Sequence, residues 1–216
     1  HRARGHHLPP QSLQMVDRTA QPLGQRLLAH GLGHGASARV ARAYEEVKKR
    51  RGSELDESSM QKIAEMVGVG ALRYNIIKVQ PEKDIVFRWE EALNFEGNAM
   101  PFIQYAHARA CGILSKVKKH TYQCDAALLS NPSEVELIKH FARLPIIVSE
   151  ACISCKPHIV ASYAYETAAL FNQFYRDCPV LPERDEHLRE SRLFIVWATK
   201  TVLSNVLELL GVPAPM

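Results

Sequence analysis

Tyrosine, arginine and asparagine side chains recur in two short stretches, at spacings that suit the binding of an unpaired nucleic-acid base. In the first stretch, Tyr105 and Arg109 are four residues apart, which places them on one face of a helix. A ring beside a guanidinium can stack on a base and hold its phosphate. Spacing alone favours a plainer alternative, in which Tyr105 packs in a core and Arg109 pairs with a carboxylate.

The second stretch carries Tyr165, Asn172 and Tyr175, separated by seven and three residues. These spacings place the three side chains on one side of a helix. Stacking rings, together with an amide that hydrogen-bonds to base edges, are how single-stranded RNA loops are usually read. The alternative is a tyrosine-rich contact between helices with its hydroxyl groups at the rim.

No comparable pattern indicates catalysis. The sequence has neither a Gly-x-Ser-x-Gly nucleophile turn nor a Gly-x-x-x-x-Gly-Lys-Ser/Thr phosphate loop. Glu90 and Glu91 are adjacent, so on a helix they point about 100° apart and do not converge as an acid–base pair. His30-Gly-Leu-Gly-His34 has no strand before it and indicates no nucleotide site.

Cys152-Ile-Ser-Cys155, followed by His158, has the residue types of a zinc site. However, the next cysteine, Cys178, is distant, no second Cys-x-x-Cys occurs, and a knuckle glycine is missing. We therefore expect no metal and interpret the pair as two thiols on or near a helical face. Five cysteines without a secretory signal favour reduced thiols and a cytoplasmic location.

Length and composition indicate a soluble globular protein. The 216 residues are 46% hydrophobic and 23% charged, enough for a core and a solvated surface. Apolar runs end well short of the ~18 residues that a bilayer span needs, so no membrane partner is expected. A net charge of +4 and a pI of about 8.8 permit a polyanionic partner without requiring one.

Helical periodicity extends from about residue 36 to the end, without a convincing pair of alternating strands. The pattern predicts an all-α bundle with short connections, over residues 36–216. Residues 1–35 hold five of the ten histidines and no sustained period, and are predicted to be poorly ordered or atypical. Tyr105 and Arg109 fall on a helix that opens at Pro101, and the second stretch falls on a long segment from Pro157 to Asp177.

Local signals predict where several helices begin and end. Asp56 is a candidate N-cap for a helix that Gly68 and Gly70 terminate, and a separate short helix then starts at Ala71. Ser133 is a candidate N-cap for a later helix. The final helix is predicted over Glu183–Leu210, closed by a glycine at position 211.

Several blocks of the sequence resemble arginyl-tRNA synthetases of the archaeal type. The most specific is Pro101-Phe-Ile-Gln-Tyr-Ala-His-Ala-Arg109, which resembles the family's Gln-Tyr-Ala-His-Ala-Arg signature. Further blocks match in the same order: Gly70-Ala-Leu-Arg-Tyr74, Trp89-Glu-Glu-Ala-Leu-Asn-Phe-Glu-Gly-Asn98 and Phe171-Asn-Gln-Phe-Tyr-Arg-Asp-Cys-Pro-Val-Leu181. The closing Leu-Leu-Gly-Val-Pro-Ala-Pro-Met216 resembles the family's usual ending. The resemblance covers roughly residue 40 to the end.

The resemblance implies a helical bundle of the class I synthetase anticodon-binding type. Such a bundle binds the anticodon stem and loop of an arginine tRNA, and the larger arginine–tRNA ligase activates arginine with ATP and Mg²⁺. Gln104 and His107 belong to the signature and are assigned either to RNA or to helix packing. On matching positions, the residues implied to contact RNA are Tyr105, Arg109, Tyr165, Asn172, Tyr175 and Met216.

The family's catalytic signatures do not occur in these 216 residues. His30-Gly-Leu-Gly-His34 has one residue too many for His-x-Gly-His, and residues 10–35 hold no Lys-Met-Ser-Lys-type loop. We therefore expect no cofactor in this chain, no aminoacylation by it alone, and a separate catalytic domain as a partner; DNA is not expected to bind. The alternative is a free-standing helical module that binds RNA or protein and has no role in aminoacylation.

Overall fold

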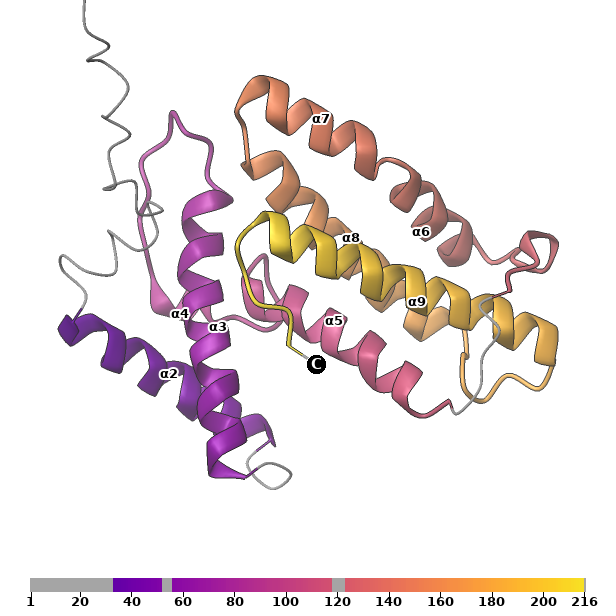
Figure 1. The fold of residues 1–216 in the computed structure, drawn as a ribbon, viewed down its shortest axis with the longest axis horizontal. Coiled ribbons are helices and arrows are strands. Elements are labelled where there is room, and N and C mark those ends of the chain that lie inside the picture. Colours follow the sequence, from indigo (N-terminus) through magenta and orange to yellow (C-terminus); the bar gives the residue numbers. More distant parts are fainter. Residues whose placement is uncertain (1–32, 52–55, 118–122, 216) are drawn as a thin grey trace, which may run out of the picture. The chain divides into compact units, whose positions relative to one another are not determined.

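A computed structural model describes residues 33–51, 56–117 and 123–215 of the chain (Figure 1). Within these ranges there are α-helices and one short 3-10 helix but no strand, which confirms the all-α prediction. The helices are α2 (Gly33–Arg51), α3 (Glu57–Ile77), α4 (Trp89–Ala92), α5 (Met100–Ser115), η1 (Ala126–Leu128), α6 (Pro132–Ala142), α7 (Leu144–Ser154), α8 (His158–Asp177) and α9 (Glu186–Leu209).

The chain divides into two units, residues 1–38 and 39–216. Most of the N-terminal segment predicted to be atypical, residues 1–32, lies outside the described residues, so that prediction remains open. Helix α2 begins at Gly33, just before the predicted boundary at residue 35. The six residues predicted to contact RNA all belong to the second unit.

Helix α3 is one uninterrupted helix, so the separate helix predicted from Ala71 is wrong. Asp56 caps its start as predicted, because its Oδ1 accepts a hydrogen bond from the Ser59 N–H at 2.6 Å. At Gly70, a Cβ atom would lie 2.9 Å from Val212 Cγ1 and 3.1 Å from Met100 Cγ. Glycine therefore serves close packing of α3 against α5 and the C-terminal tail, and this contact outweighs its cost of about 1 kcal/mol in a helix.

The N-cap of helix α6 lies two residues before Ser133, the predicted cap. Asn131 is the N-cap: its Oδ1 accepts from the Ser133 N–H at 2.9 Å, and Glu134 Oε2 accepts from the Asn131 N–H at 3.0 Å. These reciprocal bonds form a capping box. Pro132 fits the first helical turn, which moves the cap to the residue before it. The Ser133 hydroxyl instead donates to Asp177 at the end of α8.

Helix α9 ends as predicted and begins later than predicted. The Asp185 side chain caps it by accepting from the His187 N–H at 2.9 Å, so the start is Glu186 rather than Glu183. At the other end the Gly211 N–H donates to the Glu208 carbonyl and the Val212 N–H to the Leu207 carbonyl. This is a Schellman motif, and Gly211 adopts the left-handed φ of 64° that the motif requires.

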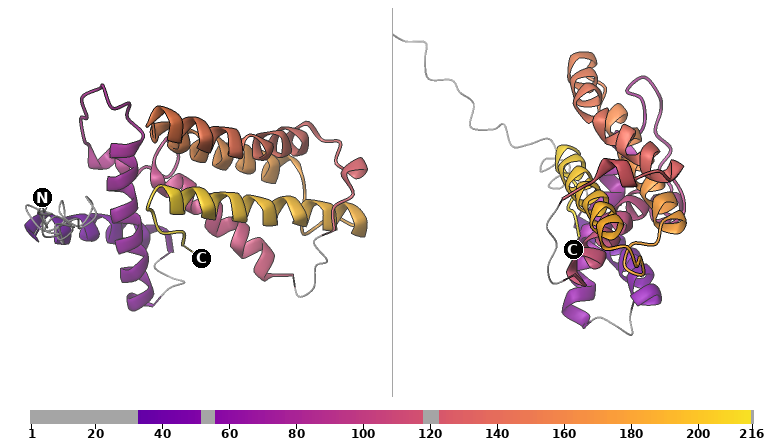
Figure 2. Two further views of the ribbon diagram at one scale, coloured as in Figure 1. Left: turned by 45° about the horizontal axis from the view of Figure 1, so that its top comes forward. Right: turned by 90° about the vertical axis from the view of Figure 1, so that its right-hand side faces the viewer.

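The main core lies where α5, α8 and α9 meet. Helix α9 packs against both other helices and runs antiparallel to α5 (Figures 1 and 2). Small buried residues on α5, Ala106 and Ala110, allow the helices to approach closely. The largest fully buried side chains of these helices include Ile103, Phe171, Phe174, Leu193, Ile195, Leu203 and Leu207. A second, smaller cluster joins Ala43 of α2, Ala64, Val67 and Ala71 of α3, and Ala92 and Leu93 around α4.

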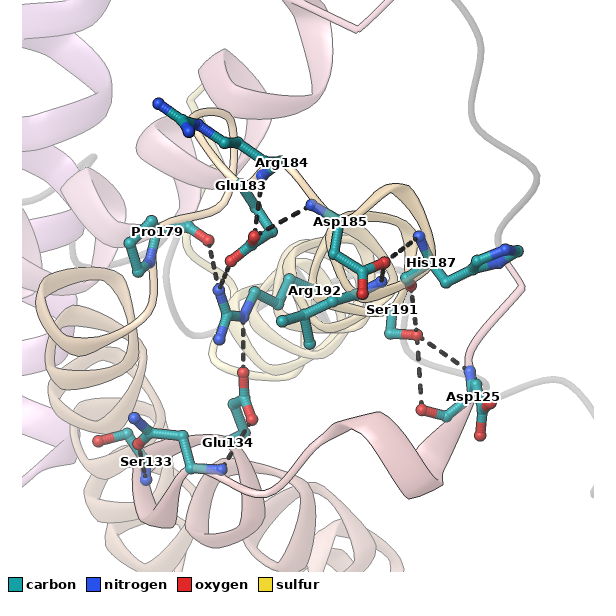
Figure 3. Close-up of polar contacts among 12 residues, drawn as sticks. Asp125, Ser133, Glu134, Pro179, Glu183, Arg184, Asp185, His187, Ser191 and Arg192 are labelled. Carbon is teal, nitrogen blue, oxygen red and sulfur yellow. Dashed lines mark hydrogen bonds and ion pairs between the residues drawn. The ribbon is translucent and has the colours of Figure 1, made fainter.

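A buried arginine joins three segments that are distant in the sequence (Figure 3). Arg192 of α9 donates from Nε to Glu134 Oε1 at 2.7 Å. Its Nη1 donates to Glu183 Oε2 at 2.7 Å and to the Pro179 carbonyl at 2.8 Å. Glu134 is 1% exposed and Arg192 is 8% exposed, so neither charge retains much contact with water. The first turn of α6, the loop between α8 and α9, and α9 itself are thereby fixed together.

We expect opposite effects from adding the same methyl group at two glycines. Gly70→Ala inserts a Cβ between α3, α5 and the tail and should lower the free energy of unfolding by about 1–3 kcal/mol. Gly112→Ala on α5 meets nothing within 4 Å and should raise it by about 1 kcal/mol. Urea denaturation measures both changes. Equal effects at the two positions would contradict the close packing at Gly70.

Removing the buried arginine should destabilise the fold strongly. Arg192→Met leaves Glu134 buried without its cation, and we expect a loss of about 3–5 kcal/mol in the free energy of unfolding. Arg88→Met is the matched control, because Arg88 pairs with Glu91 at 3.1 Å on an exposed surface. That substitution should change the free energy by less than about 1 kcal/mol. Similar losses in both variants, measured by urea denaturation, would show that Arg192 has no special role.

Candidate nucleic-acid interface

Helices α5 and α8 lie side by side and run in the same direction (Figure 1). The Phe102 and Tyr165 ring centroids are 5.4 Å apart, and Arg109 Nη1 donates to Asn172 Oδ1 at 2.9 Å. In both pairs the partners are 63 residues apart in the chain. Because the separation in residue number is the same in both pairs, two helical turns along α5 lie beside two helical turns along α8. The two helices therefore form one continuous seam.

The two predicted groups of residues meet on this seam. The Arg109 guanidinium carbon lies 4.6 Å from the Tyr105 ring centroid and 5.1 Å from the Tyr175 ring centroid. Its Nη2 also donates to the Tyr105 hydroxyl at 3.1 Å. The guanidinium is thus held between rings from two helices by cation–π attraction and hydrogen bonds. We call Tyr105, Arg109, Asn172 and Tyr175 the seam cluster.

The rings of the seam cluster are open to solvent. Tyr105 is 48% exposed and Tyr175 is 43% exposed, although both are large aromatic residues. The plainer alternative, with Tyr105 in a core and Arg109 paired to a carboxylate, is therefore wrong. The partners of Arg109 are instead the neutral Asn172 amide and the two tyrosine rings, so its positive charge is not cancelled within the cluster.

Arg109 also fixes the orientation of the Asn172 amide. Because the side-chain oxygen of Asn172 accepts from Arg109, its NH₂ group points away from the guanidinium. Within the described ranges, that NH₂ group makes no hydrogen bond to Arg109 or to either ring of the seam cluster. The Tyr105 hydroxyl likewise accepts from Arg109 and keeps its own proton to donate. The seam cluster therefore presents hydrogen-bond donors, beside rings that can stack.

Tyr165 and Met216 are not placed in the seam cluster. Tyr165 lies on the same seam, nearer the start of α8, where its ring tilts by 43° against Phe102. It is partly buried against the main core. Met216 lies outside the described residues.

Gln104 and His107 hold the C-terminal tail against α5. Gln104 Nε2 donates to the Pro213 carbonyl at 2.9 Å, and His107 Nδ1 lies 2.8 Å from the Pro215 carbonyl. A carbonyl oxygen only accepts, so Nδ1 is the protonated nitrogen of His107. Both side chains are 2% exposed. Gln104 and His107 were assigned either to RNA binding or to helix packing, and in the structure they pack the C-terminal tail against α5. Residue spacing along α5 could not reveal this contact, because the tail is more than 100 residues away in the chain.

Burial sets the protonation of this tail contact. It lowers the pKa of His107 below the ordinary value of 6.5. The hydrogen bond to the Pro215 carbonyl raises the pKa and so opposes this shift, whereas the positive charge of Lys200 lowers the pKa further. His140, which stacks on Tyr163 with ring centroids 4.3 Å apart, also has its pKa lowered by burial.

The cysteines and the histidine with the residue types of a zinc site lie at the junction of α7 and α8. Cys152 and Cys155 lie exposed at the end of α7, and His158 begins α8. In the part of the chain that the structure describes, no three His, Cys, Asp or Glu side chains are placed to hold a metal ion. No helix in that part is both long enough and apolar enough to cross a membrane.

Comparison with known proteins identifies the region that carries the seam cluster. Residues 103–216, from α5 to the chain end, match the model of a family described as the DALR anticodon binding domain. The chain belongs to this family. The matched residues of the DALR domain include all of the seam cluster and the tail held by Gln104 and His107.

Similar proteins carry arginine–tRNA ligase names. An arginine–tRNA ligase of Methanocella arvoryzae is 49% identical over 175 residues, covering 81% of this chain and 30% of that protein. One of Methanosarcina barkeri is 46% identical over 178 residues, covering 80% and 31%. The structure of Thermus thermophilus arginyl-tRNA synthetase matches with a TM-score of 0.78 at 35% identity, over 84% of this chain and 31% of that one. The chain thus spans about 30% of the length of the curated relatives it matches.

The buried histidines should make stability fall in mild acid. Well above pH 6.5, the ordinary histidine pKa, His107 and His140 are neutral in both folded and unfolded states and contribute no pH dependence. Below it the unfolded state gains protons first, so the free energy of unfolding falls by at most about 1.4 kcal/mol per pH unit for each histidine. His107→Asn keeps a donor for the Pro215 carbonyl but cannot be protonated.

Urea denaturation from about pH 8 to about pH 5 measures this loss, since that range spans the ordinary histidine pKa. The His107→Asn variant should lose stability less steeply than the unsubstituted chain as the pH falls. Identical pH profiles for the two proteins would show that His107 is protonated equally easily in both states.

Proposed function

We propose that this DALR domain binds the anticodon loop of an arginine tRNA and contributes tRNA recognition to an arginine–tRNA ligase. The observation that carries the proposal is the seam cluster, in which Arg109 lies between two exposed tyrosine rings. The family description and the names of the similar proteins support the same function. The residues proposed to contact RNA are Tyr105, Arg109, Tyr165, Asn172, Tyr175 and Met216.

The chemistry of the seam cluster suits an unstacked base. Tyr105 and Tyr175 offer ring faces on which a base stacks, a contact worth roughly 1–3 kcal/mol per base. The Asn172 amide donates to acceptor atoms on the base edge, so the preferred base carries acceptors there. Arg109 supplies positive charge for the adjacent phosphate. Recognition then combines a stacking surface with a fixed donor, while lysines and arginines elsewhere supply non-specific attraction.

Aminoacylation itself is proposed for the whole ligase, in the cytoplasm. The ligase would activate arginine with ATP and Mg²⁺ in a catalytic domain, which would be the partner of this one. These 216 residues contain neither a Gly-x-x-x-x-Gly-Lys-Ser/Thr loop nor a His-x-Gly-His signature, so no step of that chemistry is assigned to them. A free-standing module that binds RNA or protein is the competing hypothesis, and it predicts binding without anticodon preference.

Binding of an arginine tRNA transcript should depend on its anticodon. Changing the middle anticodon base is expected to weaken binding by about 1–3 kcal/mol, the loss of one stacked and hydrogen-bonded base. The measurement is the Kd of the purified chain for both transcripts at two salt concentrations. Equal and steeply salt-dependent affinities would leave only generic RNA binding and contradict the proposal.

A matched pair of substitutions separates base reading from charge. Arg109 and Lys48 each lie over a tyrosine four residues earlier in the chain, on α5 and α2 respectively. Arg109→Gln and Lys48→Gln each remove one positive charge, so each can reduce the salt dependence by about one phosphate contact. Only Arg109→Gln should also abolish the preference for the cognate anticodon. Loss of that preference in both variants, or in neither, would remove Arg109 from the proposed site.

A further inference from the structure

Helix α7 ends in two exposed cysteines that lie one turn apart. Cys152 is in the last turn, and Cys155 ends the helix in the left-handed conformation, at φ 55° and ψ 38°. The Cys155 N–H donates to the Cys152 carbonyl at 3.3 Å, and the Lys156 N–H to the Ala151 carbonyl at 3.0 Å. Cys155 Sγ lies 3.8 Å from the same Cys152 carbonyl oxygen. The second thiol is therefore folded back over the turn that carries the first.

This spacing matches the geometry of a disulfide. Residues three apart in a helical turn have Cα atoms about 5 Å apart, from the helix radius and rise. Disulfides span Cα separations of roughly 4.4–6.8 Å, so the backbone need not move far for Cys152 and Cys155 to join. A rotation of the Cys152 side chain toward the folded-back Cys155 thiol is the main adjustment needed.

The other cysteines are less available or have no thiol neighbour. Cys178 is fully buried, and burial raises the pKa of its thiol to about 12. Cys111 is half-buried beside His107, and burial raises the pKa of its thiol as well. Cys124 is exposed, but partial burial of its thiol raises the pKa, and no second cysteine is near it in sequence. Cys124 therefore serves as an internal control for an exposed thiol that has no second cysteine near it in sequence.

We propose that Cys152 and Cys155 form a dithiol site that reacts with small-molecule disulfides and closes to an internal disulfide. One cysteine, as its thiolate, attacks oxidised glutathione, which breaks the glutathione S–S bond and forms a mixed disulfide while a glutathione thiolate leaves. The other cysteine then attacks the protein sulfur of that mixed disulfide and releases the second glutathione. Two electrons pass from the protein to the glutathione disulfide, and the two thiol protons end on two glutathione thiols.

Proximity decides the end product. The second thiol is one helical turn away, so it competes at an effective concentration on the order of millimolar or higher, far above that of the released glutathione. The adduct is therefore short-lived at α7, whereas at Cys124 it persists. The closed disulfide would lock the left-handed turn that joins α7 to α8.

The test uses the whole 216-residue chain, incubated with an excess of oxidised glutathione and digested with trypsin without reduction. Residues 144–176 form one tryptic peptide that holds both α7 cysteines and no other cysteine, and residues 120–139 hold Cys124 alone. Mass spectrometry should find the first peptide lighter by two hydrogens and the second carrying glutathione. Glutathione on the α7 peptide should be roughly tenfold less abundant than on the Cys124 peptide, because of the effective concentration of the second thiol.

Two substitutions distinguish formation of the Cys152–Cys155 disulfide from the alternative that oxidised glutathione cannot reach the two thiols. In Cys152→Ser and in Cys155→Ser the remaining thiol has no partner, so it should carry glutathione as Cys124 does. Stable glutathione on the α7 peptide of the unsubstituted chain would overturn the proposal, and so would an α7 peptide that remains unmodified while Cys124 reacts. Both α7 cysteines are exposed, so the single substitutions should leave the helical circular dichroism unchanged, which separates chemistry from misfolding.

Discussion

The buried charge of Arg192 requires partners from distant segments of the second unit to be in place together. A guanidinium removed from water is tolerated only when its partners are all in place, because an unpaired buried charge costs several kcal/mol. Glu134 supplies one partner from α6, while Glu183 and the Pro179 carbonyl supply the others from the loop after α8. The end of α8 is thereby fixed against α9, and Tyr175 lies only four residues before Pro179.

The packing of α5 against α8 brings the residues of the seam cluster together on the protein surface. Parallel helices need a long connection, and in this chain the backbone passes through α6 and α7 before α8 begins. Fully buried alanines on both helices, Ala106 and Ala110 on α5 and Ala164 and Ala168 on α8, allow the backbones to approach. The register then places Arg109 opposite Asn172, and the guanidinium fills the space between two rings. Packing thus decides which side chains stay exposed as neighbours.

Local signals in the sequence predicted much of this fold but not its register. Asp56 and Gly211 mark helix ends through bonds to their own neighbours, so a short window suffices to find them. Gly70 lies inside α3 rather than breaking it, and a short window could not show this because its neighbour Val212 is distant in the chain. The seam cluster likewise depends on residues that are distant in the chain. The helical spacing within α5 and within α8 was visible in the sequence, but only the folded chain shows that Arg109 contacts Asn172 and Tyr175. Tyr165 shared the spacing and yet packs on Phe102, a difference that spacing alone could not show.

The most direct test of the seam as an RNA-binding surface is hydroxyl-radical footprinting of the chain with and without an arginine tRNA transcript. Tyr105 and Tyr175, each nearly half exposed, should be oxidised readily in the free protein and protected in the complex. Ile146 and Ile153 of α7, 68% and 84% exposed, should be oxidised equally in both states. Protection of the α7 residues with the two tyrosines unchanged would place the RNA on another face of the domain and contradict the assignment of the seam as the RNA-binding surface.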